Sequence, residues 1–225
     1  EQGVDVRIEG EGEPATLTVD RVLVAIGRRP NTETLGLEAA GVRMDEKGFI
    51  AVDERQRTSI PYIYAVGDIA GGVMLAHKAM VEGKVAAEVI AGRSAAFDVR
   101  AIPAVVYTDP QIAWAGITEE IARQQGMTVA VEKFPWKFSG RALTTGTPVG
   151  LTKMIIEADT RRVIGVGITG RGAEGLIAEG VIAIEMGALA EDVALSMHAH
   201  PTLSETEGET ADIFLGSATH ILPKT

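Results

Sequence analysis

The residues best suited to chemistry lie together near the C-terminus, at positions 198–205, which read His-Ala-His-Pro-Thr-Leu-Ser-Glu. Proline disfavours helical backbone in the residue before it, so His200 is expected to lie extended, just outside a helix that Thr202 opens. Glu205 would then occupy the first helical turn, within reach of the imidazole. An imidazole changes charge near neutral pH and a carboxylate can orient it, which is the arrangement that a general base needs.

The same spacing has a simpler interpretation. Thr202 and Glu205 match a helix capping box, in which the Glu205 carboxylate accepts a backbone N–H and never meets His200. A histidine before a proline is also common in ordinary turns. From spacing alone the turn is favoured over a catalytic site, and both interpretations stay open.

The octet resembles the C-terminal active-site segment of the dihydrolipoamide dehydrogenases. These are flavin disulfide oxidoreductases that form the E3 component of 2-oxoacid dehydrogenase complexes. The resemblance implies that His200 is the acid/base that handles the dithiol proton, that Glu205 orients it, and that the peptide before Pro201 is cis. His198 matches no catalytic position. Glutathione-reducing relatives share the shorter His-Pro-Thr pattern but differ after it, so the longer match favours the lipoamide enzymes.

Composition narrows the class of protein. The 225 residues are 46% hydrophobic and 23% charged, with a net charge of −10, which is typical of a globular protein. The basic residues are scattered, which argues against nucleic acid or an anionic membrane as a partner. No apolar run reaches the roughly 20 residues of a membrane span. Because there is no cysteine, disulfides, thiolate metal sites and cysteine nucleophiles are excluded within this chain, and no metal site is predicted.

The resembled enzymes use a Cys-x4-Cys disulfide beside the flavin and a Gly-rich nucleotide-binding loop, both in the N-terminal half of the family. Neither occurs in this sequence, which begins without methionine. The resemblance therefore implies a C-terminal half whose fold is α/β followed by α+β. Residues 1–30 would be the tail of an NAD-binding domain and 31–98 the returning part of an FAD-binding domain. Residues 99–225 would be a dimerisation domain with an antiparallel sheet.

Near the N-terminus, alternating apolar residues predict strands at 4–9 and 16–26, separated by a turn at 11–14. Gly27 ends the second strand. A glycine at that position lets a ligand approach the backbone, and a plain turn is an equally good interpretation. The resemblance places Gly27 beside the NAD cofactor, although only the tail of that domain is present.

A carboxylate follows the next predicted buried strand, at 62–66. Gly67 would permit close approach and Asp68 would lie at the strand's C-terminal end, where α/β sheets bind ligands. A Gly-Asp turn is the simpler alternative. The pattern Thr-x6-Ala-x-Gly-Asp, which starts at Thr58, is similar to the second FAD motif of the disulfide reductases. In those enzymes the aspartate holds the ribityl chain of the flavin.

A helix is predicted over 74–91, with Gly92 as its stop. A short helix-like piece at 35–38 and a short strand at 48–52 precede it. The start of the long helix offers N–H groups and a positive dipole end, which suit negative charge on a reduced flavin. The resemblance puts this turn beside the isoalloxazine ring, with His77 contributing backbone rather than acid/base chemistry. The residues so assigned are Met74, Leu75, Ala76 and His77.

Beyond a linker at 93–100 the pattern changes to strands and helices of one α+β unit. Strands are predicted at 104–107, 111–115, 128–134, 150–157 and 163–168, and helices after Thr118 and at 173–186, 190–197 and 205–215. The Gly-x-Gly-x-x-Gly at 170–175 follows a strand and opens a helix, as a dinucleotide loop does. However, the preceding strands read as antiparallel and no acid-ending strand follows, so a tight turn with close helix packing is favoured. Gly208, inside the last helix, has no explanation from sequence.

The resemblance implies a C-terminal part of a dihydrolipoyl dehydrogenase, which oxidises dihydrolipoamide with NAD through FAD and a disulfide absent from this chain. The isolated chain is expected to be inactive. The expected partners are a second copy, whose disulfide His200 would serve, and dihydrolipoamide on the E2 component. An exposed apolar interface is therefore expected. The bacterial cytoplasm is the expected location, with the mitochondrial matrix as the alternative. Two other functions stay open: a non-catalytic dimerisation module, and another disulfide reductase of the glutathione-reductase kind.

Overall fold

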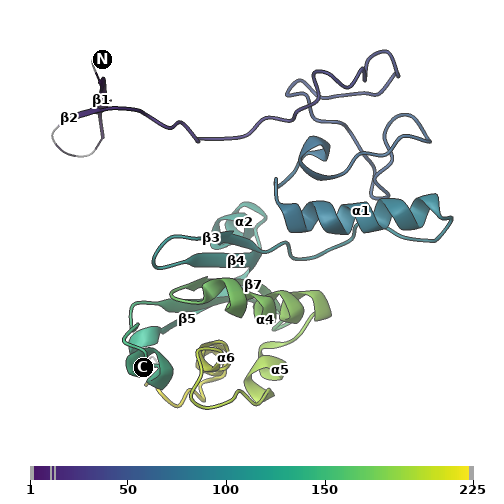
Figure 1. Ribbon diagram of the computed structural model, residues 1–225. Helices are drawn as coiled ribbons and strands as arrows, with labels where there is room; N and C mark the ends of the chain where they lie inside the picture. Colours follow the sequence, from purple (N-terminus) through teal and green to yellow (C-terminus); the bar gives the residue numbers. More distant parts are fainter. Residues whose placement is uncertain (1–2, 11, 13, 223–225) are drawn as a thin grey trace.

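The computed structural model describes residues 3–10, 12 and 14–222. The chain takes three forms along its length (Figure 1): a hairpin near the N-terminus, a loop-rich part that carries one long helix, and a body of sheet and helices. The division into domains at residues 30 and 98 stays a prediction. In the described ranges, no helix has the length and apolarity needed to cross a membrane.

The hairpin joins β1 (Val4–Ile8) and β2 (Ala15–Val19), which pair antiparallel. Two residues of the turn predicted between them, 11 and 13, lie outside the described residues. The predicted strand at 16–26 is too long. Residues 20–26 form no strand, and Leu23 and Ile26 are 90% and 95% exposed. An extended segment becomes a strand only when a neighbour completes its hydrogen bonds, and the described part of the chain supplies none beyond β2.

Residues 31–75 are mostly turns and loops, and three predictions made for them are wrong. Residues 35–38 form turns rather than a helix. The strands predicted at 48–52 and 62–66 are reduced to single bridging pairs, Met44 with Ile50 and Arg57 with Tyr64. The apolar residues there fill a small core around Val42, Ile50 and Ala65 without a ladder of neighbouring strands.

Side-chain carboxylates organise the turns of this loop-rich part. Oδ1 of Asp45 accepts the N–H groups of Lys47 and Phe49, each at 2.9 Å. Oδ1 of Asp53 accepts the N–H groups of Arg55 and Arg57 in the same way. These Asp side chains imitate a backbone turn and satisfy donors that a sheet would otherwise take.

The long helix α1 (Ala76–Ile90) confirms the helix predicted over 74–91. Gly92, with φ of +79°, follows its last turn, as the predicted stop requires. Val85, Ala86 and Val89 are buried. A 3₁₀ turn, η1 (Gly67–Ala70), lies against α1 and carries Asp68.

The body contains a five-stranded sheet in the order β3-β4-β7-β6-β5, and every neighbouring pair is antiparallel. The predicted antiparallel sheet is confirmed, with strand limits within one or two residues. The strands are β3 (Ala104–Val106), β4 (Ile112–Gly116), β5 (Val129–Pro135), β6 (Leu151–Glu157) and β7 (Val163–Thr169).

Short helices occupy the connections of this sheet. Between β4 and β5 lies α2 (Glu119–Gln124), where Oγ1 of Thr118 accepts the N–H of Ile121, so the predicted cap is confirmed. After β5 come η2 (Trp136–Phe138) and α3 (Gly140–Thr144).

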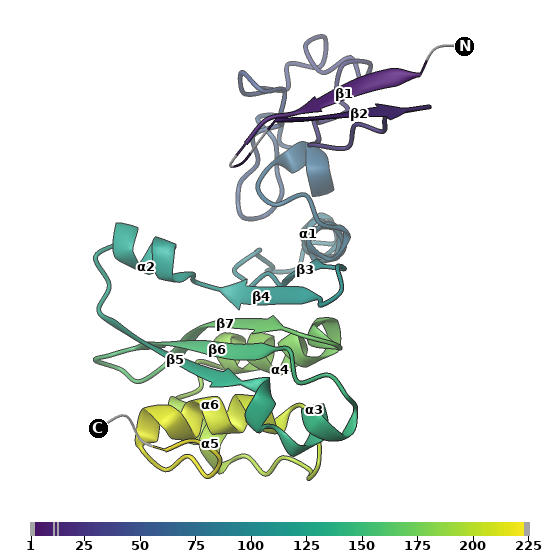
Figure 2. The ribbon, with the colours of Figure 1, turned by 90° about the vertical axis from the view of Figure 1, so that its left-hand side faces the viewer.

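Three helices follow the sheet: α4 (Ala173–Met186), α5 (Ala190–Leu195) and α6 (Glu205–Leu215). The bounds of α4 match the prediction, and α6 covers the predicted 205–215, although a start at Thr202 was also expected. Helix α4 contacts β4 and β7, and α6 contacts β5 and β6. A Cβ on Gly180 would lie 2.8 Å from Cβ of Val166, so glycine lets α4 approach the sheet. In both ribbon views the sheet lies between α1 and the α5–α6 pair (Figures 1 and 2).

The Gly-rich loop at 170–175 joins β7 to α4. A Cβ on Gly170 would lie 2.2 Å from Cζ3 of the fully buried Trp136, and Gly172 has φ of +83°. The glycines therefore serve a tight turn and close packing, as predicted.

The sheet surface formed by alternate residues of β4, β6 and β7 carries an apolar groove of about 330 Å³. Ile112 and Trp114 are exposed there, and Leu151 and Ile155 also line it. An exposed apolar surface is therefore present on this part of the chain. Its role as the contact surface between two copies stays a proposal.

One carboxyl is buried in the body without a hydrogen-bond partner. Glu207, in the first turn of α6, is 1% exposed, and its Oε1 meets no donor in the described residues. The pKa of Glu207 is raised to about 9, mainly by burial and to a smaller extent by the nearby Glu179 carboxylate. The side chain is therefore a neutral acid in the folded protein at neutral pH.

We predict that Glu207 makes the chain less stable as pH rises. Between about pH 4.5 and 9 the unfolded chain has lost this proton and the folded chain keeps it. Over that window the group lowers the free energy of unfolding by about 1.4 kcal/mol per pH unit. Glu207→Gln should remove this slope in unfolding measured at a series of pH values. Glu174→Gln, an exposed acid on α4, should leave it in place, and an unchanged slope in the Glu207 variant would contradict the assignment.

Candidate functional site

His200 lies in the turn between α5 and α6, and its side chain is 71% exposed. The peptide between His200 and Pro201 is cis, as expected, and so is the one before Pro110. The helix begins at Glu205 rather than at Thr202, so the predicted helix start is three residues too early. The turn holds the imidazole just outside the helix, as the proline predicted.

The Glu205 carboxylate makes both contacts that the sequence offered as alternatives. Oε1 lies 2.8 Å from Nδ1 of His200, and Oε2 accepts the backbone N–H of Thr202 at 2.7 Å. An ionised carboxylate only accepts hydrogen bonds, so Nδ1 carries the proton. In the neutral ring Nε2 is then the unprotonated nitrogen, which can take a proton from a substrate.

The electrostatics keep Glu205 ionised. Partial burial alone would raise its pKa, but the Thr202 N–H and the His200 imidazole stabilise the charged form, so the pKa lies below the ordinary value of 4.5. Nearby His220 acts in the same direction. The acid is therefore in the state needed to orient the imidazole.

Hydroxyl groups fix the turn and anchor it to the sheet. Oγ1 of Thr202 donates to the Ala199 carbonyl at 2.7 Å, which closes the turn. Thr206 follows Glu205 in the chain and is buried, and its Oγ1 lies 2.7 Å from Oγ1 of Thr152 on β6. Trp136 donates its ring N–H to the same Thr152 hydroxyl at 3.0 Å. The helix start that carries Glu205 is therefore tied to the core.

Two further histidine–glutamate pairs surround this site, and the sequence reasoning missed both. Nε2 of His198 lies 2.5 Å from Oε1 of Glu179 on α4. Nδ1 of His220 lies 2.7 Å from Oε1 of Glu209. One member of the second pair had a signal in the sequence. Glu209 lies four residues after Glu205 and therefore shares its helix face, but the spacing does not point to His220.

Gly208 now has a structural explanation. A Cβ at this position would lie 2.9 Å from Nδ1 of His198, so the glycine leaves room for that ring against α6. A glycine inside a helix lowers the stability of that helix. At position 208 it also lets the loop that carries His198 pack against α6.

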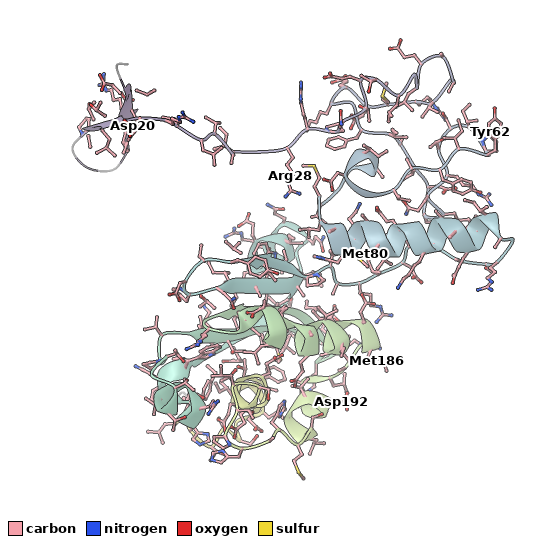
Figure 3. All side chains as sticks on the ribbon, in the orientation of Figure 1. Asp20, Arg28, Tyr62, Met80, Met186 and Asp192 are labelled. Atoms are coloured by element: carbon pink, nitrogen blue, oxygen red, sulfur yellow. The ribbon has the colours of Figure 1, made fainter. Side chains whose placement is uncertain are left out.

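The predicted cofactor residues lie elsewhere, around the start of α1. The Asp68 side chain is 49% exposed and lies 3.9 Å from Nη1 of Arg28. The same Arg28 nitrogen donates to the Met74 carbonyl at 2.8 Å, and Figure 3 shows this arginine beside the beginning of α1. At Gly27, a Cβ would meet no described atom within 4 Å.

Helix α1 begins after Leu75, which supplies no side-chain cap, so its first N–H groups are left to other acceptors. Met74 and Leu75 precede the helix, and Ala76 and His77 open it. The side chain of His77 is also used, because its Nε2 lies 2.7 Å from the Pro103 carbonyl and must donate to it.

The structure therefore brings the predicted residues together in two groups. His200 and Glu205 are in contact. The η1 turn that carries Asp68 contacts α1, and α1 lies on the other side of the sheet from α6, which begins at Glu205 (Figures 1 and 2). Within the ranges that the structure describes, no cluster of His, Cys, Asp and Glu has the arrangement of a metal site.

Comparisons with known proteins cover most of the chain. The family model for the pyridine nucleotide-disulphide oxidoreductase dimerisation domain matches residues 102–211, and the model for pyridine nucleotide-disulphide oxidoreductase matches residues 2–83. The dihydrolipoyl dehydrogenases of Haemophilus influenzae and Geobacillus stearothermophilus are both 49% identical, over 98% and 100% of this chain. That of Thermus scotoductus is 50% identical over 99%. The chain spans about half the length of these relatives, 46% to 48%.

Solved structures agree with this grouping. The HOCl-induced flavoprotein disulfide reductase RclA from Escherichia coli matches 92% of this chain and 48% of its own length, with a TM-score of 0.82 and 27% identity. LpdA from Mycobacterium tuberculosis matches 89% of this chain and 44% of its own length, with a TM-score of 0.83 and 27% identity. On both sequence and structure, the chain belongs to the pyridine nucleotide-disulphide oxidoreductase family.

Proposed function

We propose that this chain is the C-terminal part of a dihydrolipoyl dehydrogenase, in which His200 is the acid/base and Glu205 orients it. The observation that carries the proposal is the contact between Nδ1 of His200 and the ionised Glu205, in a chain about 49% identical to dihydrolipoyl dehydrogenases. The function of the whole protein is part of the proposal, because about half of such a protein is represented here.

In the reaction so proposed, Nε2 of His200 accepts the proton of a dihydrolipoamide thiol, because the thiolate is the reactive form. Glu205 stabilises the imidazolium that results and keeps the ring from rotating. The thiolate attacks a disulfide that is not in this sequence, which has no cysteine. The exposed position of His200, just before α6, which lies on the other side of the sheet from α1, supports a base that serves the disulfide of a second copy.

FAD fits the residues around the start of α1, where, when bound, it would carry electrons to NAD from the dithiol that dihydrolipoamide forms by reducing the disulfide. Asp68 keeps a half-exposed carboxylate that can accept hydrogen bonds from ribityl hydroxyls. The helix start at Ala76 and His77, without a side-chain cap, offers N–H groups to the flavin ring. Gly27, whose surroundings are open, is assigned to NAD, and the rest of that site lies outside this sequence.

A homodimer is supported by the match of residues 102–211 to a dimerisation domain. The finer assignments are part of the proposal: dihydrolipoamide carried on the E2 component of a 2-oxoacid dehydrogenase complex, and the cytoplasm of a bacterium. Another disulfide substrate is the main alternative, since RclA is named a disulfide reductase, but its identity of 27% is lower than the 49% of the lipoyl enzymes.

The first test is made on the full-length parent protein. We expect purified parent to show the visible absorbance of bound flavin and to reduce NAD with dihydrolipoamide. Flavin without lipoamide turnover would point to another disulfide substrate. Absence of flavin from the parent would overturn the enzyme assignment and leave a dimerisation module.

We predict that His200→Gln in the parent protein lowers dihydrolipoamide turnover by about 10²-fold or more, the usual contribution of a general acid–base group. Flavin content and dimer mass should not change, because the side chain is exposed. Lys84→Gln, an exposed change on α1, serves as the control. An unchanged kcat would contradict the assignment of His200.

We predict that Glu205→Gln lowers turnover less than the His200 change and also loosens the turn. The carboxylate holds Thr202 and His200 together, so its loss should cost about 1 kcal/mol of unfolding free energy. Because the pKa of Glu205 lies below 4.5 in the folded chain, its ionisation stabilises the fold above that pH. This stability is lost as pH falls through the folded pKa, and the variant should lack that loss. Equal acid sensitivity of variant and parent would count against the contact.

A further inference from the structure

Two buried charged side chains on α1 hold both ends of the turn that carries Asp68. Lys78 and Glu82 are 7% and 3% exposed, and Nζ of Lys78 lies 2.5 Å from Oε1 of Glu82. The other oxygen, Oε2 of Glu82, accepts the N–H of Gly67 at 2.7 Å, where η1 begins. Nζ of Lys78 donates to the carbonyl of Gly71 at 2.9 Å, just past the end of η1. One ion pair therefore fixes both ends of a four-residue turn.

The turn needs such support because its backbone is unusually free. Gly67, Gly71 and Gly72 have φ of +78°, +80° and +69°. Glycine reaches these values readily but loses much conformational entropy when it is fixed there. In the described residues, the only other long-range backbone hydrogen bond of η1 comes from the N–H of Ile50, which donates to the Ile69 carbonyl at 2.8 Å. A Cβ on Gly67 would lie 3.2 Å from Cβ of Ala79, so the turn lies directly on α1.

Stability alone does not account for this pair. A buried ion pair is costly to desolvate, and apolar side chains of similar volume are often as stable or more so. What an apolar pair does not provide is a donor and an acceptor aimed at two backbone groups four residues apart, the Gly67 N–H and the Gly71 carbonyl. The ion pair therefore fixes geometry, and the geometry it fixes belongs to the turn.

The Asp68 carboxylate depends on that turn for its position. It is half exposed, and the side chain that pairs with it, Arg28, keeps its Nη1 as far away as 3.9 Å. With so little holding the side chain itself, the direction in which it points follows from the backbone of Gly67 and its neighbours. A displacement of the turn would therefore move the carboxylate away from any ligand bound there.

We infer that Lys78 and Glu82 are positioning residues for the flavin: they hold the Gly67–Ala70 turn so that Asp68 meets the polyhydroxylated ribityl chain. The inference rests on the proposed function, which assigns Asp68 to that chain. Neither Lys78 nor Glu82 touches the ligand, and both act through the backbone of the turn.

The test measures FAD affinity in the full-length parent, with flavin fluorescence quenching on titration of the apoprotein. The variant Lys78→Met/Glu82→Met keeps the volume of both side chains and removes both backbone anchors. We expect its FAD dissociation constant to rise at least about tenfold, on the scale of losing a charge-assisted hydrogen bond. Its melting temperature without FAD should stay close to that of the parent.

A matched control lies on the same helix. Lys84 and Glu88 are also four residues apart and in the same order, but both are exposed and neither contacts η1 in the described structure. Lys84→Met/Glu88→Met makes the same chemical change and should leave the FAD dissociation constant unchanged. A purely structural role for the buried pair would instead lower the melting temperature and leave the affinity of the folded fraction as it was.

A milder variant keeps the inference testable if the double change prevents folding. Glu82→Gln keeps the length of the side chain and a carbonyl oxygen for the Gly67 N–H, but a neutral amide accepts a weaker bond than a carboxylate. We expect a several-fold rise in the FAD dissociation constant. Parent-like affinity in every folded variant would overturn the inference and leave the proposed function standing. A parent protein that binds no FAD would overturn both.

Discussion

The site depends on one carboxylate that serves two donors. Glu205 gives one oxygen to the backbone of Thr202 and the other to the ring of His200. The first contact fixes the carboxylate at the start of α6, and the second fixes the imidazole to the carboxylate. The sequence offered a backbone contact and an imidazole contact as alternatives, but here the backbone contact is what makes the orientation of the imidazole possible. The resemblance to a disulfide oxidoreductase is therefore consistent with the local physical chemistry.

The surrounding fold makes that small unit rigid. Thr206 and Trp136 meet the same hydroxyl of Thr152, so the first turn of α6 is attached to a central strand through fully buried side chains. On the other side of the turn, His198 is held against α4 by Glu179. The exposed His200 thus projects from a support that has little freedom, as precise proton transfer requires. Two residues after Glu205, the neutral acid Glu207 occupies a buried site that favours neither charge nor hydrogen bonding.

The sequence predicted best those elements whose partners lie within the chain. The antiparallel sheet and helices α4 and α6 were expected almost to the residue, because each apolar face has a neighbour here to cover it. The strands predicted at 16–26, 48–52 and 62–66 had the right composition, but the described residues give them no full ladder. Propensity describes what a segment prefers, and a strand also needs a second strand.

The contacts of the sites were harder to predict than the elements. Lys78 and Glu82 are visible as an i and i+4 pair, but spacing alone does not reveal that this pair is buried against a glycine-rich turn. The contact between His198 and Glu179 joins the loop after α5 to α4 and has no local signature at all. The resemblance supplied the roles proposed for His200 and Asp68, and only the folded chain shows what holds each of them in place.

The extended stretch between β2 and Gly27 has a consequence for the chain on its own. Leu23 and Ile26 are almost fully exposed, and the backbone beside them forms no ladder in the described structure. Such a stretch is a template for strand addition, since any extended segment can supply the missing hydrogen bonds and cover the apolar side chains. The isolated chain therefore has a route to self-association that does not involve the sheet groove. In concentrated solution, self-association of the isolated chain would depend on residues 20–26 as much as on residues 102–211, which match the dimerisation domain.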